Sequence, residues 1–114
     1  MKIIISPAKS LDFENKASTN LYTQPSFIGK SIELNKKLKT FSKKDLGNLM
    51  KISPALAELN YQRNQNWQPP FSLENAKQAV FAFTGEVFRG IDVGTLPKDK
   101  ISLLQERLRI LSGL

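Results

Sequence analysis

A short run of β-branched residues at the start of the chain is the strongest constraint on its fold. Residues 2–5 read Lys-Ile-Ile-Ile, and Ser6-Pro7 follows them directly. The run does not alternate between apolar and polar residues, so it predicts a strand buried on both faces, as in a parallel sheet. Residues 80–83 also have strand character, but two strands do not make an independent sheet. The sequence therefore predicts either further strands in its ambiguous segments or a chain that is a piece of something larger.

Between these two segments, apolar spacing and capping residues predict three helices. Residues 26–39 place apolar side chains on one face at helical spacing. Ser42 and Asp45 form a capping box in front of a helix over residues 43–50. Ser53 and Pro54 begin the next helix, which runs to about residue 62. The side chains expected to turn inward from these helices are Phe27, Leu34, Leu38, Phe41, Leu46, Leu49, Met50, Leu56 and Leu59.

The remaining segments complete a mixed α/β pattern. Residues 6–23 and 64–70 are polar and predict loops, and Ser72 caps a helix of two turns that ends at residue 77. Residues 86–91 fit either a short helix or a strand. Pro97 opens a last helix with one apolar face, unless a strand begins at Arg109. The order of strand, helices, strand and helix predicts a mixed α+β or α/β fold. The apolar face of the last helix would hold Ile101, Leu104, Leu108 and Leu111.

The chain has no Cys and no His. This composition excludes thiol nucleophiles, disulfides, zinc ribbons, haem ligation and catalysis by histidine. Any metal would need oxygen ligands alone, so we expect no metal and no cofactor. No apolar run approaches the ~18 residues of a membrane helix, and the apolar start is too short for a signal peptide. We therefore expect a cytoplasmic protein that does not contact a membrane.

Positive charge is concentrated in one stretch of the chain. The net charge is +7, and residues 36–51 hold six Lys against one Asp, which is +5 in sixteen residues. The other ninety-eight residues carry 11 basic and 9 acidic side chains. A basic patch of this kind is typical of a site for a polyanion. The alternative is an ordinary solvated helix face.

The connection within this patch indicates how a polyanion would be held. Only Lys51-Ile52-Ser53 separates the two helices, which exposes backbone amides at the start of the second one, where the helix dipole favours an anion. Residues 42–64 thus resemble a helix-hairpin-helix, which grips a backbone phosphate without reading bases. Lys51 and Ser53 stand where such hairpins usually carry glycine, so an ordinary helical hairpin is the alternative. The predicted DNA-binding residues are Lys43, Lys44, Lys51 and Ser53, with Lys9 and Arg63 lining a neighbouring basic groove.

Several motifs in order along the chain resemble one protein family. Residues 6–12 read Ser-Pro-Ala-Lys-Ser-Leu-Asp, and residues 49–53 read Leu-Met-Lys-Ile-Ser. Trp-Gln-Pro at 67–69, Asn-Ala-Lys-Gln-Ala at 75–79 and Phe-Thr-Gly-Glu-Val-Phe-Arg-Gly at 83–90 follow. Residues 108–114 end the series with Leu-Arg-Ile-Leu-Ser-Gly-Leu. Together they resemble the YaaA family of bacterial peroxide-stress resistance proteins.

The resemblance implies an unusual α/β fold that contains a helix-hairpin-helix and a cytoplasmic DNA-binding protein. It also implies protection against hydrogen peroxide, partly by limiting free intracellular iron and the damage that iron drives. The family offers no catalytic residue to carry over. Its members continue well past Ser112-Gly113, so the resemblance implies that residues 1–114 are a single domain, the N-terminal half of a longer member. The surface left by the missing half would then favour self-association.

An enzyme is the main alternative to a DNA-binding protein. Lys9 follows the first strand, and its amine could form a Schiff base with a nucleic acid or a phosphorylated small molecule, assisted by Asp12 and Glu86. Ser6 and Lys9 also match the Ser-x-x-Lys motif of penicillin-recognising enzymes, but no Lys-Thr-Gly partner accompanies them. Direct binding of iron is a third reading. Ten carboxylates without His or Cys make a poor iron site, so we expect any effect on iron to be indirect.

Three further residues have a structural reading beside a functional one. Trp67 could stack on a base, but a tryptophan in such a loop more often covers the edge of a core. Gly85 and Gly90 could approach a phosphate, yet no phosphate-binding loop surrounds them. We expect turns or close packing at both glycines.

Overall fold

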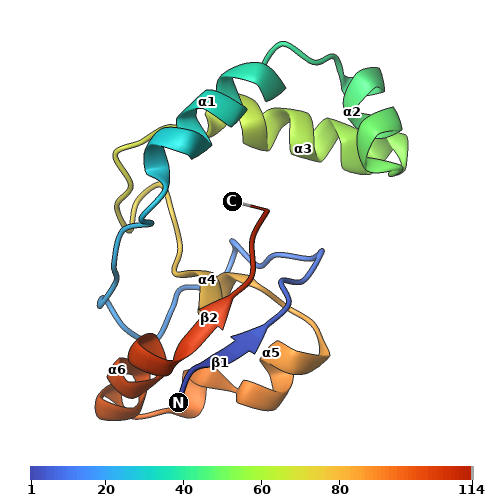
Figure 1. Cartoon of the computed structure of the whole chain (residues 1–114). Helices are drawn as coiled ribbons and strands as arrows, with labels where there is room; N and C mark the ends of the chain where they lie inside the picture. The colour runs from blue at the N-terminus through green and yellow to red at the C-terminus, as the bar shows by residue number, and fades with distance from the viewer. Residues whose placement is uncertain (114) are drawn as a thin grey trace. The chain divides into compact units, whose positions relative to one another are not determined.

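A computed structural model describes residues 1–113 and confirms a mixed α/β fold. These residues form six α-helices, one short 3-10 helix and a two-stranded parallel sheet. They divide into two compact units, one made of residues 1–24 and 71–113 and the other of residues 25–70. We call the first the sheet unit and the second the hairpin unit (Figure 1).

The two strands of the sheet unit come from the two ends of the described chain. β1 (Ile3–Ile5) pairs in parallel with β2 (Leu108–Ile110), with Ile3 opposite Leu108 and Ile5 opposite Ile110. The strand predicted at residues 2–5 is confirmed. Its predicted burial on both faces is wrong, because the Ile4 side chain is 63% exposed. A strand buries both faces only when a layer covers each of them, and no such layer covers Ile4 in residues 1–113.

A helix leads directly into β2. α6 (Lys98–Arg107) begins just after Pro97, as predicted, and ends before the strand. The predicted alternative of a strand near Arg109 is therefore also confirmed, starting one residue earlier. Leu108 lies in that strand and Leu111 follows it, so these two residues do not share a helix face with Ile101 and Leu104.

The polar segment 6–23 is a loop, as predicted, and it is fastened to the second half of the sheet unit. Leu11 and Phe83 form an isolated antiparallel bridge, and the Asp12 amide donates to the Ala82 carbonyl at 2.7 Å. The strand predicted at residues 80–83 is wrong, because α4 (Ala79–Ala82) is a single helical turn that buries Ala82. Short apolar runs fit a buried helical turn as well as a strand, and here only Phe83 pairs.

A short helical segment follows the bridge and supplies most of the core of the sheet unit. α5 (Glu86–Ile91) shows that the ambiguous segment is a helix, and η1 (Val93–Thr95) continues it. Phe88 and Val93 are buried, and the Phe88 ring lies 5.3 Å from the Phe83 ring between centroids. Gly85, with φ of 123°, makes the turn into α5, which confirms the predicted turn there.

Two smaller predictions in this unit are wrong. Ser72 does not cap a helix of two turns: the Ser72 amide donates to the Asn75 side chain at 2.7 Å, and the chain makes one turn only. Gly90 lies inside α5, and open space surrounds the position that its Cβ would take. It therefore serves neither a turn nor a close approach.

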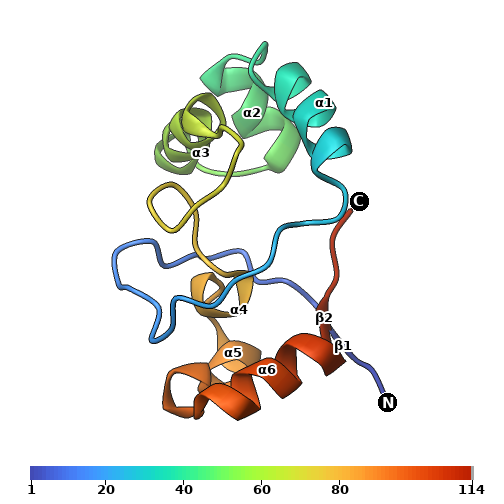
Figure 2. The ribbon, with the colours of Figure 1, turned by 90° about the vertical axis from the view of Figure 1, so that its left-hand side faces the viewer.

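The hairpin unit consists of three helices, α1 (Ile28–Leu38), α2 (Lys43–Met50) and α3 (Pro54–Asn66) (Figure 2). α2 has the predicted bounds, whereas α3 runs past residue 62 into the segment predicted as a loop. Side-chain amides tie α1 and its C-terminal turn to α3. The Asn35 amide donates to the Asn64 carbonyl at 3.2 Å, and the Gln65 amide donates to the Lys39 carbonyl at 3.3 Å.

Small residues bring α2 and α3 together. Leu46 is fully buried and Ala57 is 3% exposed, and a Cβ added to Gly47 would lie 3.4 Å from the Cβ of Ala57. The helices thus meet along Leu46, Gly47 and Ala57. The inward stripe predicted from the larger apolar residues is wrong for part of its members. In α2 and α3 the reason is that this line of contact turns the larger apolar side chains outward. The exposed members of that predicted stripe are Phe27, Leu34, Leu49, Met50, Leu56 and Leu59.

Among residues 1–113, no helix is long and apolar enough to cross a membrane.

Candidate nucleic-acid interface

The hairpin unit carries most of the net charge of the chain. Residues 25–70 hold eight basic and three acidic side chains, so they contribute +5 of the total +7. The sheet unit and its larger number of residues contribute the other +2. The basic stretch of the sequence therefore lies within one compact unit, where the charges of its lysines add to one local positive potential.

Two of these lysines begin α2. Lys43 and Lys44 are its first residues, and Ser42 and Asp45 close the predicted capping box ahead of them. The Asp45 amide donates to Ser42 Oγ at 3.1 Å, and the Ser42 amide donates to Asp45 Oδ2 at 3.1 Å. The hydrogen bonds from the Ser42 hydroxyl and amide lower the pKa of Asp45. The helix dipole disfavours cations at the N-terminus of a helix, so the lysines at the start of α2 do not stabilise this helix through its dipole.

The connector between α2 and α3 has a left-handed residue at its first position. Lys51 adopts φ of 52° and ψ of 51°, and the Ile52 amide donates back to the Gly47 carbonyl at 3.2 Å. This is a helix ending that glycine usually occupies. The sequence lacks the glycine of a helix-hairpin-helix here, yet the backbone takes the conformation that such a glycine would allow.

Ser53 begins α3 and holds its first turn. The Leu56 amide donates to Ser53 Oγ at 3.3 Å, and the Ala57 amide donates to the Ser53 carbonyl at 2.9 Å. Pro54 has no amide hydrogen. Among the described residues, the Ala55 amide is therefore the one backbone donor in this turn that does not already bond to Ser53. An anion could accept a hydrogen bond from it without breaking an existing one. The helix end that we predicted to be open offers fewer amides than expected.

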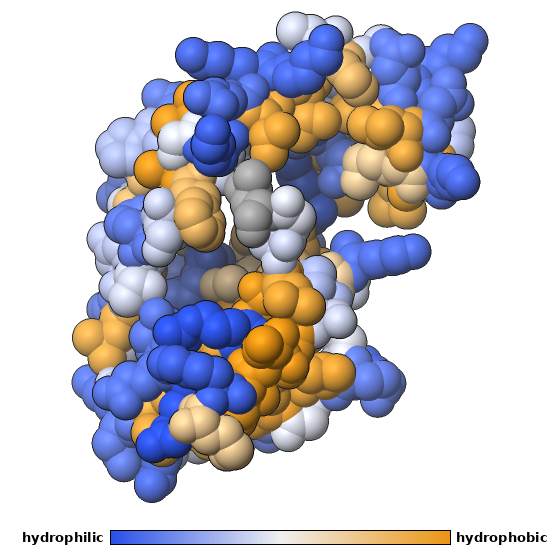
Figure 3. Space-filling view, in the orientation of Figure 1, coloured by the Kyte–Doolittle hydropathy of each residue, from blue (hydrophilic) through white to orange (hydrophobic). Residues whose placement is uncertain are grey.

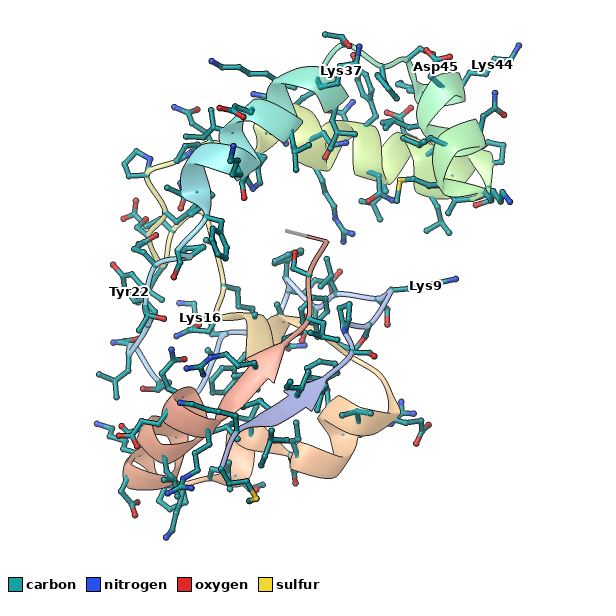
Figure 4. The ribbon with its side chains drawn as sticks, viewed as in Figure 1. Lys9, Lys16, Tyr22, Lys37, Lys44 and Asp45 are labelled. Atoms are coloured by element: carbon teal, nitrogen blue, oxygen red, sulfur yellow. The ribbon has the colours of Figure 1, made fainter. Side chains whose placement is uncertain are left out.

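The lysines of the hairpin differ in how strongly the protein engages them. Lys43 forms an ion pair with Glu58 and lies 5.5 Å from the centroid of the Tyr61 ring. The hydrogen bonds from Lys43 and then from Gln62 lower the pKa of Glu58. Lys44 and Lys51 are exposed and form no ion pair within residues 1–113, and Figure 4 shows Lys44 pointing outward. Within residues 1–113, their ammonium groups are thus less engaged by the protein than that of Lys43.

The other predicted site residues lie in both units. Arg63 is half-buried in α3, within the hairpin unit. Lys9 belongs to the sheet unit, where its exposed side chain extends away from the loop (Figure 4). The groove between Lys9 and Arg63 stays a prediction. Lys37 is not among the predicted site residues, yet its Nζ lies 5.8 Å from the centroid of the Phe41 ring near the end of α1. Its place in the Lys-rich stretch was the available signal.

The residues of the enzyme alternative have separate surroundings. Asp12 Oδ1 accepts the amides of Glu14 and Asn15 at 2.9 and 3.1 Å, and the Asn15 side chain donates to Oδ2 at 3.0 Å. These bonds, led by that of the Asn15 side chain and helped by Lys77, lower the pKa of Asp12 to about 2. Such a weak base is poorly suited to accept a proton at neutral pH. Glu86 instead pairs with Arg89 on the surface of α5.

Lys77 is the partner of Asp12, and it is not among the residues predicted from the sequence. Its Nζ lies 3.6 Å from Asp12 Oδ2 and donates to the Asp12 carbonyl at 2.9 Å. Nearby, the Ser10 and Thr84 hydroxyls lie 2.6 Å apart. This polar cluster fastens the loop 6–23 to the segment before α5, which is a structural role. No group of three or more acidic, histidine or cysteine side chains that could hold a metal occurs in residues 1–113.

Comparison with known proteins decides the family. The family model described as "Peroxide stress protein YaaA" matches residues 1–114. The chain belongs to the YaaA family. It is 50% identical over its whole length to a UPF0246 protein of Flavobacterium johnsoniae and to one of Shewanella baltica. It is 47% identical over 113 residues to a UPF0246 protein of Flavobacterium psychrophilum.

The match covers this chain almost completely but the relatives only in part. The chain spans 45% of each of the two Flavobacterium proteins and 44% of the Shewanella protein. More than half of the sequence of each of these YaaA relatives therefore lies outside the matched region.

Proposed function

We propose that the hairpin unit binds the phosphate backbone of DNA, and that this binding is its part in the peroxide stress response of the YaaA family. The observation that carries the proposal is the net charge of +5 within residues 25–70, against +2 for the rest of the chain. Charge segregated in this way creates a local positive potential, which attracts a polyanion before any specific contact forms.

The kind of side chain supports backbone contacts over reading of bases. Lys44 and Lys51 present ammonium groups, which act as point charges toward phosphate. Base reading relies more on side chains with paired donors and acceptors in a groove. We therefore expect little sequence preference. Each phosphate neutralised by a lysine adds about −0.9 to the slope of log affinity against log salt concentration, so contacts from Lys44 and Lys51 give about −2.

The left-handed turn at Lys51 and the start of α3 supply the remaining part of the site. A phosphate oxygen at this turn meets the Ala55 amide and the positive end of the α3 dipole. Lys51 belongs to the same connector, and Lys44 lies on the helix packed against α3. Charge and backbone donors are thus available within one helical hairpin.

The test is DNA binding by fluorescence anisotropy across a salt series, with a short labelled duplex. The Lys44→Glu, Lys51→Glu double variant is expected to lose at least tenfold in affinity and most of its salt dependence. The matched control is Lys16→Glu with Lys98→Glu, two exposed lysines of the sheet unit, because it changes the net charge of the chain by the same amount.

Circular dichroism of both double variants shows whether they are folded, so that a loss of DNA affinity is not mistaken for unfolding. Binding that ignores salt, or an equal loss in the matched control, would contradict a site in the hairpin unit. In the first case the contacts are not ionic, and in the second the total charge alone determines the affinity.

Iron enters this proposal indirectly. We propose that protection from iron-driven damage, if the whole protein provides it, acts through DNA and not through a metal bound to residues 1–113. The chain offers no His or Cys, and carboxylates alone are weak selective ligands for Fe(II). Calorimetric titration with Fe(II) under anaerobic conditions checks this, and micromolar binding would overturn it.

A further inference from the structure

One face of the small sheet is apolar and uncovered in the described part of the chain. Ile4 pairs with Arg109, and Leu111 lies two residues beyond Arg109, so side-chain alternation places all three on one face. Ile4 is 63% exposed and Leu111 is 52% exposed. The Leu111 amide still donates to the Ile5 carbonyl at 2.9 Å, so the ladder continues to this residue. Figure 3 shows apolar residues gathered over the two strands.

Arg109 does not screen this face with its charge. Its guanidinium Nη1 donates to the carbonyls of Gln105 and Leu108 at 2.9 and 2.7 Å, so the head group is folded back toward α6. The aliphatic part of such a side chain is itself compatible with an apolar neighbour. The surface around Ile4 and Leu111 therefore suits an apolar partner better than water.

The architecture of the sheet points the same way. Parallel sheets occur almost only with both faces covered, and two strands alone are marginal. In residues 1–113 each of the two strands pairs with the other alone, so each has one edge with backbone groups that no strand satisfies. A sheet edge of this kind is a template for a further strand.

We propose that the face carrying Ile4 and Leu111, together with the adjoining sheet edge, docks the polypeptide that forms the rest of the relatives. The relatives match this chain at up to 50% identity over its full length, yet more than half of each lies outside the match. Their matched region thus has the same sheet, and the remaining polypeptide is the natural source of a further strand and of an apolar covering layer. A nucleic acid is a poor partner for this face, because the face is apolar and nucleic acids bind mainly through phosphate contacts with cationic side chains.

The experiment mixes the 114-residue chain with the polypeptide made from the unmatched part of the Flavobacterium johnsoniae protein. Light scattering after size-exclusion chromatography is expected to show a one-to-one complex. Hydrogen exchange is expected to slow at the amides of Ile3–Ile5 and Leu108–Ile110. Ile4→Glu and Leu111→Glu are each expected to weaken the complex at least tenfold. Leu21→Glu, which changes an equally exposed leucine in a loop of the same unit, is the matched control and leaves the complex intact.

Three results overturn the proposal. A homodimer of the chain that Ile4→Glu dissolves would show that a second copy covers the face. A chain that is folded by circular dichroism, yet stays monomeric and binds nothing, would show that the face needs no cover. Equal weakening by Leu21→Glu would place the contact elsewhere. DNA binding is measured separately in the hairpin unit, so failure here leaves the proposed function untouched.

Discussion

Lys51 combines a backbone conformation that costs stability with a charge that suits DNA. A residue with a Cβ is disfavoured in the left-handed region by about 1–2 kcal/mol, whereas glycine is not. The side chain is exposed and forms no ion pair within residues 1–113. Nothing in the folding of the hairpin thus requires a lysine at this position, which is consistent with the proposed contact to phosphate.

The Lys51→Gly variant separates these two properties. We expect the free energy of unfolding to rise by about 0.5–1 kcal/mol, because the left-handed strain is relieved and only part of the gain is lost to the flexibility of glycine in the unfolded chain. We expect DNA affinity to fall and the salt slope to shrink by about one phosphate contact. Urea denaturation and anisotropy measure the two. A loss of stability together with affinity would show that Lys51 has a structural role.

Asp12 makes the sheet unit sensitive to acid. Its pKa is about 2 in the folded chain, below the ordinary 3.8, because hydrogen bonds and Lys77 favour the carboxylate. The stabilisation it provides is complete above pH 3.8 and is lost as the pH falls through about 2. We expect Asp12→Asn to be less stable than the wild type at pH 6, with a difference that narrows toward pH 2. Thermal denaturation across this range checks it, and Glu74→Gln serves as the control in the same unit.

Among the elements, the contact between α2 and α3 depends on one small residue. Gly47 leaves room for Ala57, and a methyl group at residue 47 would reach ordinary van der Waals distance, 3.4 Å from the Ala57 Cβ. We expect Gly47→Ala to be neutral or stabilising, because alanine favours a helix by about 1 kcal/mol over glycine. In Gly47→Val, the Cβ carries two further methyl groups, for which the contact with Ala57 leaves no room. We therefore expect this variant to destabilise the hairpin by about 1–3 kcal/mol. Urea denaturation of the two variants measures the difference, and equal stability would show that the helices can move apart.

The elements that the sequence predicts best are those that local chemistry decides. The capping box at Ser42 and the Ser53-Pro54 start define α2 and α3 because both signals act within one helical turn. The turn at residues 79–82 depends on contacts with the distant loop 6–23, and the facing of α2 toward Ala57 depends on how it packs against the next helix. The spacing of Leu49 and Leu56 alone therefore indicated the wrong faces.

The same distinction applies to the candidate site. The concentration of lysines is visible in the sequence and survives as the charge of the hairpin unit. The ion pair that engages Lys43 is not visible, because Glu58 comes from the facing helix. Lys77 was missed for a similar reason, since its partner Asp12 lies 65 residues away in the chain.

At the scale of the whole molecule, the large exposed surface predicts an unfolding transition of low steepness. The dependence of unfolding free energy on urea scales with the surface that unfolding exposes. A chain that keeps 8629 Å² accessible in its folded state has less surface left to expose. We expect a slope near 1 kcal/mol/M, at the lower end for small proteins, and a steeper slope when the proposed partner polypeptide is bound. Urea titration followed by circular dichroism measures both.

The hydrogen bond between Gln24 and Phe71 has a consequence for how this chain can be rearranged. The Gln24 side chain donates to the Phe71 carbonyl at 2.9 Å. The two residues of the sheet unit that flank residues 25–70 therefore lie next to each other. We therefore expect that a short turn from residue 24 to 71 can replace residues 25–70, because the entropy of loop closure varies only slowly with loop length. We also expect that helical segments of different charge can be inserted at this junction without a change in the pairing of the strands.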